Sequence, residues 1–121
     1  MKRVLIVEDS PTMRTILVST IESLDGYTVV EASNGFEALR ILPRDTIDLI
    51  ITDINMPDIN GLELISYLKN SSLYNGTPLI ILSTDGSEKD REKGLALGAN
   101  EYLVKPFDPF ELQNLVRKYI E

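Results

Sequence analysis

The side chains that could do chemistry in this 121-residue chain are carboxylates, hydroxyls and lysines, because the sequence contains no Cys and no His. The absence of Cys excludes disulfides, thiolate catalysis and zinc–cysteine sites. The absence of His excludes Ser-His-Asp triads and phosphohistidine relays. Within this limited set, Glu8, Asp9 and Asp53 draw attention because they follow short apolar runs.

Polar residues follow four of these runs at corresponding points. The residues are Glu8 and Asp9 after 4–7, Asp53 after 49–52, Ser83 and Thr84 after 79–82, and Lys105 after 102–104. If the runs are parallel strands, their carboxyl ends meet at one edge of the sheet, where ligands bind in doubly wound folds. We therefore expect these side chains to converge.

Three carboxylates gathered at one edge need positive charge. Two unit charges 4 Å apart repel by roughly 4 kcal/mol at an effective dielectric constant near 20. Lys105 supplies one cation, and a hard divalent ion suits an oxygen-only ligand set, which favours Mg²⁺ over zinc. Without metal, one carboxylate could instead hold a proton, and the cluster would titrate as a unit.

The roles of these residues can then be separated. Asp53 follows a run typical of a central, rigid strand, and a carboxylate can act as a covalent nucleophile toward phosphorus. Glu8 and Asp9 are predicted to hold Mg²⁺, directly or through water. Ser83 and Lys105 are predicted to contact phosphoryl oxygens, with help from backbone amides in the Asn55-Met56 turn.

Each signal is weak by itself. Glu8-Asp9 alone fits a polar strand end, Asp53 a common strand terminus, Ser83-Thr84 a helix cap and Lys105-Pro106 a turn. Their occurrence together at corresponding strand ends favours a shared site over coincidence.

The elements that must position these residues alternate along the chain. Strands are predicted at 4–7, 27–30, 49–52, 79–82 and 102–104, and their unbroken apolar character indicates burial on both faces. Helix starts are predicted at Ser10-Pro11, at Asn34 with Glu37, at Ser87 with Asp90 and at Asp108-Pro109 with Glu111. A further helix is predicted over 61–69, and Gly26 and Gly98 mark helix ends.

The helical stretches carry apolar residues at spacings typical of packing faces. The packing candidates are Met13, Ile16, Leu17, Ile21 and Leu24; Phe36, Ala38, Leu39 and Leu42; Leu62, Ile65 and Leu68; and Phe110, Leu112, Leu115, Val116 and Tyr119. Alternation of strand and helix five times predicts one α/β domain over 1–121, a doubly wound (βα)5 sandwich with a parallel sheet. Residues 70–77 are predicted to form a surface loop.

The charge balance limits the partners. The net charge of −7 opposes direct binding of nucleic acid, since no basic run offsets it. The first apolar run is too short for a signal or a membrane span, so we expect a cytoplasmic protein without membrane insertion.

The ordered motifs of the chain resemble those of two-component response-regulator receiver domains, the CheY-like family. The matching segments are 4–9, 53–57 with Gly61, 81–84 and 98–107, and the resemblance covers essentially the whole chain. It implies a flavodoxin-like fold with a five-stranded parallel sheet of order 2-1-3-4-5.

The resemblance also implies how the site works. Asp53 would take a phosphoryl group, in a Mg²⁺-dependent reaction, from a sensor histidine kinase or phosphotransfer protein, and often from small phosphodonors. Glu8, Asp9 and the Asn55 backbone carbonyl would serve the metal with Asp53. Lys105 would contact the phosphoryl group and precede a cis peptide bond.

The same resemblance implies a switch. Ser83 would move toward the phosphoryl group, and Tyr102 would rotate into the space released. The surface of the fourth helix, fifth strand and fifth helix would then change for a downstream protein, with the domain acting as a monomer or a phosphorylation-dependent dimer. The domain would catalyse only its own phosphorylation and dephosphorylation.

Some positions differ from common members. Glu8 stands where many members have Asp, Ser83 is an accepted alternative to Thr, and Thr84 is larger than the usual residue, so we hypothesise that it shields the phosphorylated Asp53 and slows hydrolysis. Ser10-Pro11-Thr12-Met13-Arg14 resembles chemotaxis-type members, yet Ser87 and Glu88 replace basic residues found in that group. A flagellar motor target is therefore not predicted.

Two other functions fit parts of the same pattern. A non-phosphorylated pseudo-receiver would be an interaction module, but the intact acidic set with Ser83 and Lys105 argues against it. A haloacid-dehalogenase-type phosphohydrolase needs a second Asp two residues after the nucleophile, where this chain has Asn55.

Overall fold

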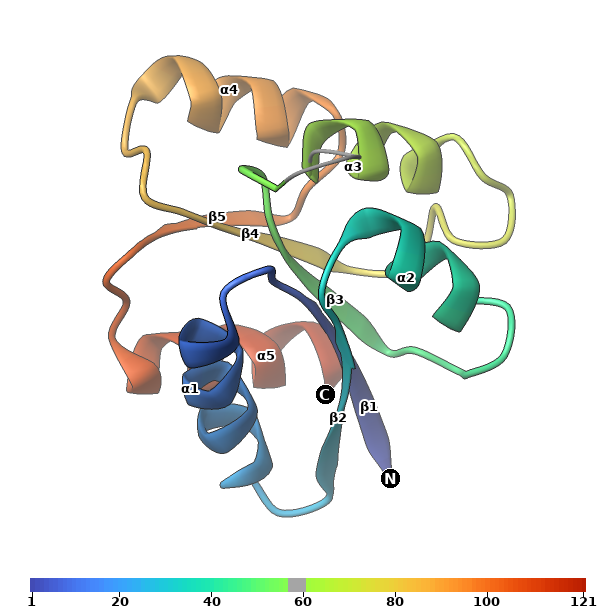
Figure 1. Ribbon diagram of the computed structural model, residues 1–121, viewed down its shortest axis with the longest axis vertical. Helices are drawn as coiled ribbons and strands as arrows, with labels where there is room; N and C mark the ends of the chain where they lie inside the picture. Colours follow the sequence, from blue (N-terminus) through green and yellow to red (C-terminus); the bar gives the residue numbers. More distant parts are fainter. Residues whose placement is uncertain (57–60) are drawn as a thin grey trace.

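Strands and helices alternate from end to end in the computed structural model, which describes residues 1–56 and 61–121 (Figure 1). The strands are β1 (Lys2–Val7), β2 (Tyr27–Ala32), β3 (Leu49–Asp53), β4 (Leu79–Ser83) and β5 (Glu101–Val104). The helices are α1 (Pro11–Glu22), α2 (Gly35–Ile41), α3 (Gly61–Lys69), α4 (Glu88–Ala96) and α5 (Pro109–Ile120).

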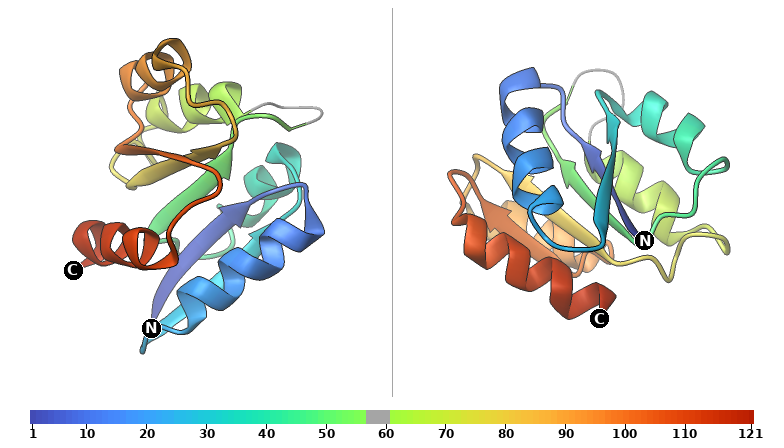
Figure 2. Two further views of the ribbon diagram at one scale, coloured as in Figure 1. Left: turned by 90° about the vertical axis from the view of Figure 1, so that its left-hand side faces the viewer. Right: turned by 90° about the horizontal axis from the view of Figure 1, so that it is seen from below.

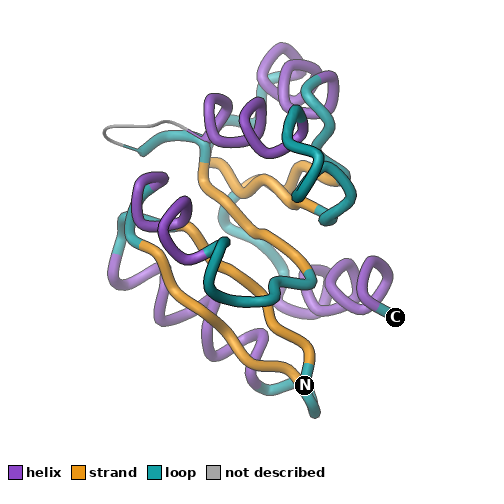
Figure 3. Tube along the Cα trace, turned by 90° about the vertical axis from the view of Figure 1, so that its right-hand side faces the viewer, coloured by secondary structure: helices purple, strands orange, loops and turns teal. Residues whose placement is uncertain are grey.

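All strand pairs in the sheet are parallel, and the order is β2-β1-β3-β4-β5. Helices α1 and α5 cover one face, and α2, α3 and α4 cover the other (Figures 1 and 2). The strands therefore form the middle of three layers, as Figure 3 also shows. The predicted doubly wound (βα)5 fold with order 2-1-3-4-5 is confirmed.

Two apolar cores lie on opposite faces of the sheet because successive side chains of a strand point in opposite directions. In β1, Val4 and Ile6 pack in the core under α1 and α5, whereas Leu5 and Val7 pack in the core under α2 and α3. Strands β3 and β4 are buried along their whole length, as their apolar runs predicted. The edge strands β2 and β5 are only partly buried, so the prediction of burial on both faces was wrong for them.

The predicted N-cap residues of four helices are confirmed. The side chains of Ser10, Asn34, Ser87 and Asp108 each accept a hydrogen bond from a backbone amide two or three residues later. The Glu37 carboxylate reaches back to Ser33 rather than to Asn34, accepting from its amide at 3.3 Å and its hydroxyl at 2.7 Å. These caps set the direction in which each helix leaves the sheet.

Several details differ from the predictions. Helix α1 ends at Glu22, before Gly26, which instead takes a positive φ of 82° in the turn into β2. Ile16, Phe36 and Phe110 are exposed by 45%, 52% and 75%, so they are not packing residues. Phe36 and Phe110 each lie two positions before a buried residue, and two positions rotate by about 200° around a helix.

The strand register brings the carboxyl ends of the central strands to one edge. Val7 of β1 pairs with Thr52 of β3, and Asp53 pairs with Leu82 of β4. Ser83 pairs with Val104, so Lys105 follows at the same edge. No helix among the described residues is long and apolar enough to cross a membrane.

Candidate functional site

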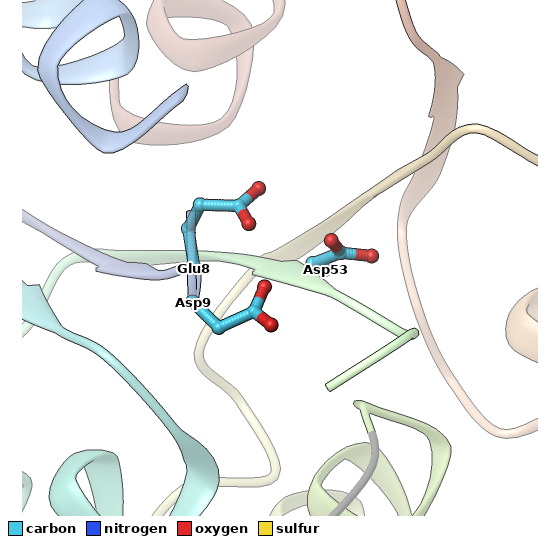
Figure 4. Close-up of side chains that lie close together, drawn as sticks. All are labelled: Glu8, Asp9 and Asp53. Atoms are coloured by element: carbon cyan, nitrogen blue, oxygen red, sulfur yellow. The ribbon is translucent and has the colours of Figure 1, made fainter. Parts of the chain in front are cut away.

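Three carboxylates gather at this edge of the sheet. Glu8 and Asp9 follow β1, and Asp53 is the last residue of β3. One carboxylate oxygen from each lies within 4.8 Å of the other two (Figure 4). Glu8 and Asp53 are buried, with 1% and 7% of their surface exposed, whereas Asp9 is open to solvent. The predicted convergence is therefore present, with one accessible side.

Lys105 neutralises part of this charge. Its ammonium donates to Glu8 Oε1 at 2.7 Å and to Asp53 Oδ2 at 3.0 Å. Its backbone amide donates to the Ser83 carbonyl at 2.7 Å, and the Lys105–Pro106 peptide is cis, as the resemblance implied. Burial alone would lower the pKa of Lys105, but the hydrogen bonds to the two carboxylates raise its pKa above the ordinary value.

Glu8 is a constrained carboxylate. Its Oε2 accepts from the Ser10 amide at 3.1 Å, so both of its oxygens have protein partners. Burial raises the pKa of Glu8 above its ordinary value, although the hydrogen bonds from Lys105 and Ser10 act in the opposite direction. Glu8 therefore competes for protons more strongly than an exposed glutamate.

The backbone around Asp53 holds its side chain. Asp53 Oδ1 accepts from the Asn55 amide at 3.0 Å, and the Thr52 hydroxyl donates to the Asp53 carbonyl at 2.9 Å. The first residue of α3, Gly61, donates its amide to the Ile54 carbonyl at 3.1 Å. A β-carbon at Gly61 would lie only 2.3 Å from the Asp53 carbonyl oxygen. Pro57, which belongs to the same motif, lies outside the described residues.

The predicted switch residues lie beside one another. Ser83 is fully buried, and its hydroxyl accepts from the Asp85 amide at 3.0 Å. Tyr102 is 4% exposed, and its hydroxyl donates to the Asp85 carbonyl at 2.5 Å. Thr84, which follows Ser83 in the loop after β4, is exposed. Tyr102 is thus already buried in the unmodified chain, whereas the resemblance implied that its ring turns inward only after phosphorylation.

The donor set fits a hard divalent cation. Glu8, Asp9 and Asp53 offer only oxygen ligands, one side chain is accessible, and the acidic residues outnumber the single ammonium among them. Mg²⁺ prefers such ligands and keeps several waters, which the open side at Asp9 allows. The Asn55 amide contact places residue 55 next to Asp53; coordination by its carbonyl stays a prediction.

Two contacts at the site had no signal in the sequence patterns. Arg14 of α1 donates from its guanidinium to the Glu8 carbonyl at 2.8 Å. The Asp85 carbonyl accepts a hydrogen bond from the Tyr102 hydroxyl, and the Asp85 amide donates one to the Ser83 hydroxyl. Both contacts use backbone groups, which every residue possesses, so residue type alone does not reveal them.

Comparison with known proteins agrees with this geometry. The response regulator receiver domain family model matches residues 4–117. A chemotaxis protein CheY homologue of Campylobacter jejuni is 39% identical over 88% of this chain and 83% of its own length. The structure of the chemotaxis response regulator CheY4 of Vibrio cholerae superposes with a TM-score of 0.89, at 36% identity and 98% coverage of both chains.

A third relative was solved with metal. The receiver domain of the sensor histidine kinase PA1611 from Pseudomonas aeruginosa, with a magnesium ion coordinated in its active site cleft, has a TM-score of 0.89. It is 32% identical and covers 98% of this chain and 97% of its own. The family model, the curated relative and the solved structures agree in family and fold: this chain belongs to the CheY-like response regulator receiver domains of two-component signalling.

Proposed function

We propose that Asp53 is the phosphoacceptor of a signalling switch and takes its phosphoryl group in a Mg²⁺-dependent reaction. The observation that carries this proposal is the cluster itself, in which oxygens of Glu8, Asp9 and Asp53 lie within 4.8 Å of one another while Lys105 contacts Asp53. The donor is a phosphohistidine of a sensor kinase or phosphotransfer protein, or a small acyl phosphate.

Each residue of the site has its own role in the reaction. An Asp53 oxygen attacks phosphorus and the bond from phosphorus to the donor atom breaks. A phosphohistidine donor leaves as an imidazole that takes up a proton from water, whereas an acyl phosphate leaves as a carboxylate and needs no proton. The Asn55 amide and the Lys105 ammonium contact different oxygens of Asp53, which fixes the plane of the carboxylate. Glu8, Asp9 and Asp53, with the Asn55 carbonyl, would hold Mg²⁺, which neutralises phosphoryl oxygens when bound.

The phosphoryl group then acts as the signal. It adds negative charge and strong acceptor oxygens beside Ser83 and Lys105. The Ser83 hydroxyl, which accepts from Asp85, can donate its hydrogen to a phosphoryl oxygen. Movement of Ser83 is transmitted through Asp85 to Tyr102, and so to the surface of α4, β5 and α5 that a downstream protein recognises. The domain has no external substrate to turn over.

The test is intact-mass measurement after incubation with acetyl phosphate and Mg²⁺. We expect one phosphoryl group on the wild-type chain, none on Asp53→Asn, and none when EDTA removes the metal. Glu111→Gln, an exposed carboxylate on α5, is the control and should be modified like wild type. A wild-type chain that stays unmodified with acetyl phosphate and with a phosphorylated kinase domain would overturn the proposal and favour a non-phosphorylated interaction module.

A further inference from the structure

Arg14 is held at the junction of three elements. It lies in the first turns of α1, and its NH1 donates to the Glu8 carbonyl at 2.8 Å. Its Nε lies 3.4 Å from the Glu31 carboxylate on β2. Its side chain is 21% exposed. A single guanidinium therefore connects the loop that follows β1 with α1 and β2.

The contact with the Glu8 carbonyl constrains both metal-binding carboxylates. The Glu8 carbonyl and the Asp9 amide belong to one rigid peptide plane. The orientation of that plane sets the backbone angle ψ of Glu8 and φ of Asp9, and hence the direction of both side chains. A charge-assisted hydrogen bond to the carbonyl is shorter and stronger than a neutral one, so it resists rotation of the plane.

The other bonds of the loop support the same function. The Glu8 amide donates to the Ala32 carbonyl at 3.0 Å, and the Arg14 amide donates to the Ser10 carbonyl at 2.9 Å. These bonds hold the two ends of the segment 8–10, whereas the Arg14 guanidinium holds the peptide between the two acidic residues. Glu31 is 53% exposed, so its ion pair with Arg14 orients the guanidinium and adds little stability of its own.

We propose that Arg14 is a positioning residue for the metal site, acting through the Glu8–Asp9 peptide plane. The proposal rests on the proposed function in that Glu8 and Asp9 are taken as metal ligands. Substitution of residues that hydrogen-bond to metal ligands typically weakens metal binding by about 10- to 100-fold. Loss of a contact to the backbone leaves the ligand side chains intact, so its effect on affinity should be at or below the lower end of that range.

The substitution that isolates this effect is Arg14→Lys. Loss of a cation near the acidic cluster would by itself strengthen Mg²⁺ binding, so a neutral variant would mix two opposing effects. Lysine keeps the charge but lacks the planar guanidinium, which contacts Glu31 and the Glu8 carbonyl at the same time. Arg40→Lys, at an exposed position of α2, makes the same chemical change away from the site.

The measurement is the Mg²⁺ dissociation constant by calorimetry, with amide hydrogen exchange at Ser10, whose amide donates to Glu8 Oε2, in the metal-free chains and unfolding by urea. We expect Arg14→Lys to weaken Mg²⁺ binding about 3- to 10-fold and to speed exchange at Ser10, with Arg40→Lys unchanged. Glu31→Asp, which keeps the charge but shortens the side chain that contacts Arg14, should give a smaller effect in the same direction.

The outcomes separate this inference from the proposed function. If Arg14→Lys lowers stability but leaves the dissociation constant and the Ser10 exchange rate of the folded chain unchanged, Arg14 is merely structural and the inference is overturned. If wild type itself does not bind Mg²⁺, the metal site of the proposed function fails. In that case faster Ser10 exchange in Arg14→Lys would still report on the peptide plane, because the Ser10 amide bonds to the Glu8 side chain that this plane orients.

Discussion

The Tyr102 hydroxyl donates a hydrogen bond to the backbone carbonyl of Asp85, across the loop that joins β4 to α4. The Asp85 amide also donates to the Ser83 hydroxyl. Two hydrogen bonds through Asp85 therefore connect the buried Ser83 with the Tyr102 side chain of β5. Burial raises the pKa of Tyr102, so the phenol keeps its proton and its role as a donor throughout the physiological pH range.

Removal of this phenol should therefore loosen the β4–α4 loop. Tyr102→Phe keeps the ring in the core but leaves the Asp85 carbonyl without this donor, and we expect unfolding free energy to fall by about 1 kcal/mol. Urea unfolding measures this. Tyr119→Phe, which removes a more exposed hydroxyl bonded to Glu101, should cost less. Equal stability of Tyr102→Phe and wild type would show that the hydrogen bond does not hold the loop.

Lys105 compensates buried negative charge in the metal-free chain. Lys105, Glu8 and Asp53 side chains are exposed by only 10%, 2% and 9%, and removal of one partner from a buried ion pair costs about 3–5 kcal/mol. We expect Lys105→Met to lose stability of that order without metal. Added Mg²⁺ should restore more stability to this variant than it adds to wild type, because the cation binds a site with one positive charge fewer.

Lys69 offers a matched control for this measurement. Its ammonium is partly buried and donates to the Asn75 and Thr77 carbonyls, away from the acidic cluster. Lys69→Met should be destabilised without any increase in the stabilisation that Mg²⁺ provides. Thermal unfolding with and without Mg²⁺ compares the three chains, and an equal gain in all of them would contradict the assigned role of Lys105.

Metal affinity should depend on pH through Glu8. Burial raises the pKa of Glu8, so in the metal-free folded chain this carboxyl keeps a proton at pH values where an exposed glutamate has lost it. Mg²⁺ must displace that proton, so its affinity rises with pH up to the raised pKa, by at most about tenfold per pH unit for one proton, and then levels off. The contribution of the same group to folding stability declines as the pH rises through that window.

Calorimetric titrations with Mg²⁺ from pH 4, just below the ordinary glutamate pKa of 4.5, to pH 8 test this expectation. Glu8→Gln should bind Mg²⁺ more weakly at neutral pH and should lose a smaller fraction of its affinity on acidification. Wild type and Glu8→Gln with identical pH profiles would show that another group governs the dependence.

Gly61 gives α3 its close approach to the Asp53–Ile54 peptide. A β-carbon there would lie 2.3 Å from the Asp53 carbonyl oxygen and 2.5 Å from Ile54 Cα, and both neighbours are backbone atoms. Gly61→Ala should therefore cost about 3 kcal/mol or more and should reduce Asp53 modification by acetyl phosphate in the fraction that stays folded. Gly76→Ala, where a β-carbon meets nothing within 4 Å, should be tolerated in both assays.

Much of the fold could be predicted because its determinants are local. Apolar runs of the strand type located β3 and β4, and capping residues such as Ser87 located the helix starts. The strand order required the resemblance to a known family, since five parallel strands can be arranged in several ways that bury the same residues. The acidic cluster followed from strand ends meeting at one edge of the sheet.

The remaining details depend on tertiary geometry that residue types do not encode. Phe36 and Phe110 are apolar but face solvent, because the helical face that packs is set by where the sheet lies. Arg14 and Tyr102 find backbone carbonyls that are 6 and 17 positions away in the chain, and no side-chain pattern marks those acceptors. The packing face of α4 was the hardest to predict, because the sequence of this helix is mostly charged and its buried residue is a glycine, Gly94.

Gly94 is the point at which α4 packs closely on the sheet. A β-carbon at this position would lie 2.4 Å from Ile81 Cδ1 and 3.6 Å from the Tyr102 ring. Gly94→Ala gains about 1 kcal/mol of helix propensity, but overpacking a filled core costs about 1–3 kcal/mol, so we expect a net loss of up to about 2 kcal/mol. Gly86→Ala, whose β-carbon would meet Val104 at an ordinary 3.6 Å, should not be destabilised.

The clash with Ile81 can be tested by a double-mutant cycle. Ile81→Val removes the methyl group that a β-carbon at position 94 would strike, at a cost of about 0.5–1.5 kcal/mol by itself. If that methyl group is the obstacle, Gly94→Ala with Ile81→Val should lose less stability than the sum of the two single changes, as measured by urea unfolding. Additive losses would instead mean that α4 shifts as a whole. In that case amide chemical shifts along α4 and around Tyr102 should change in Gly94→Ala and stay changed in the double variant.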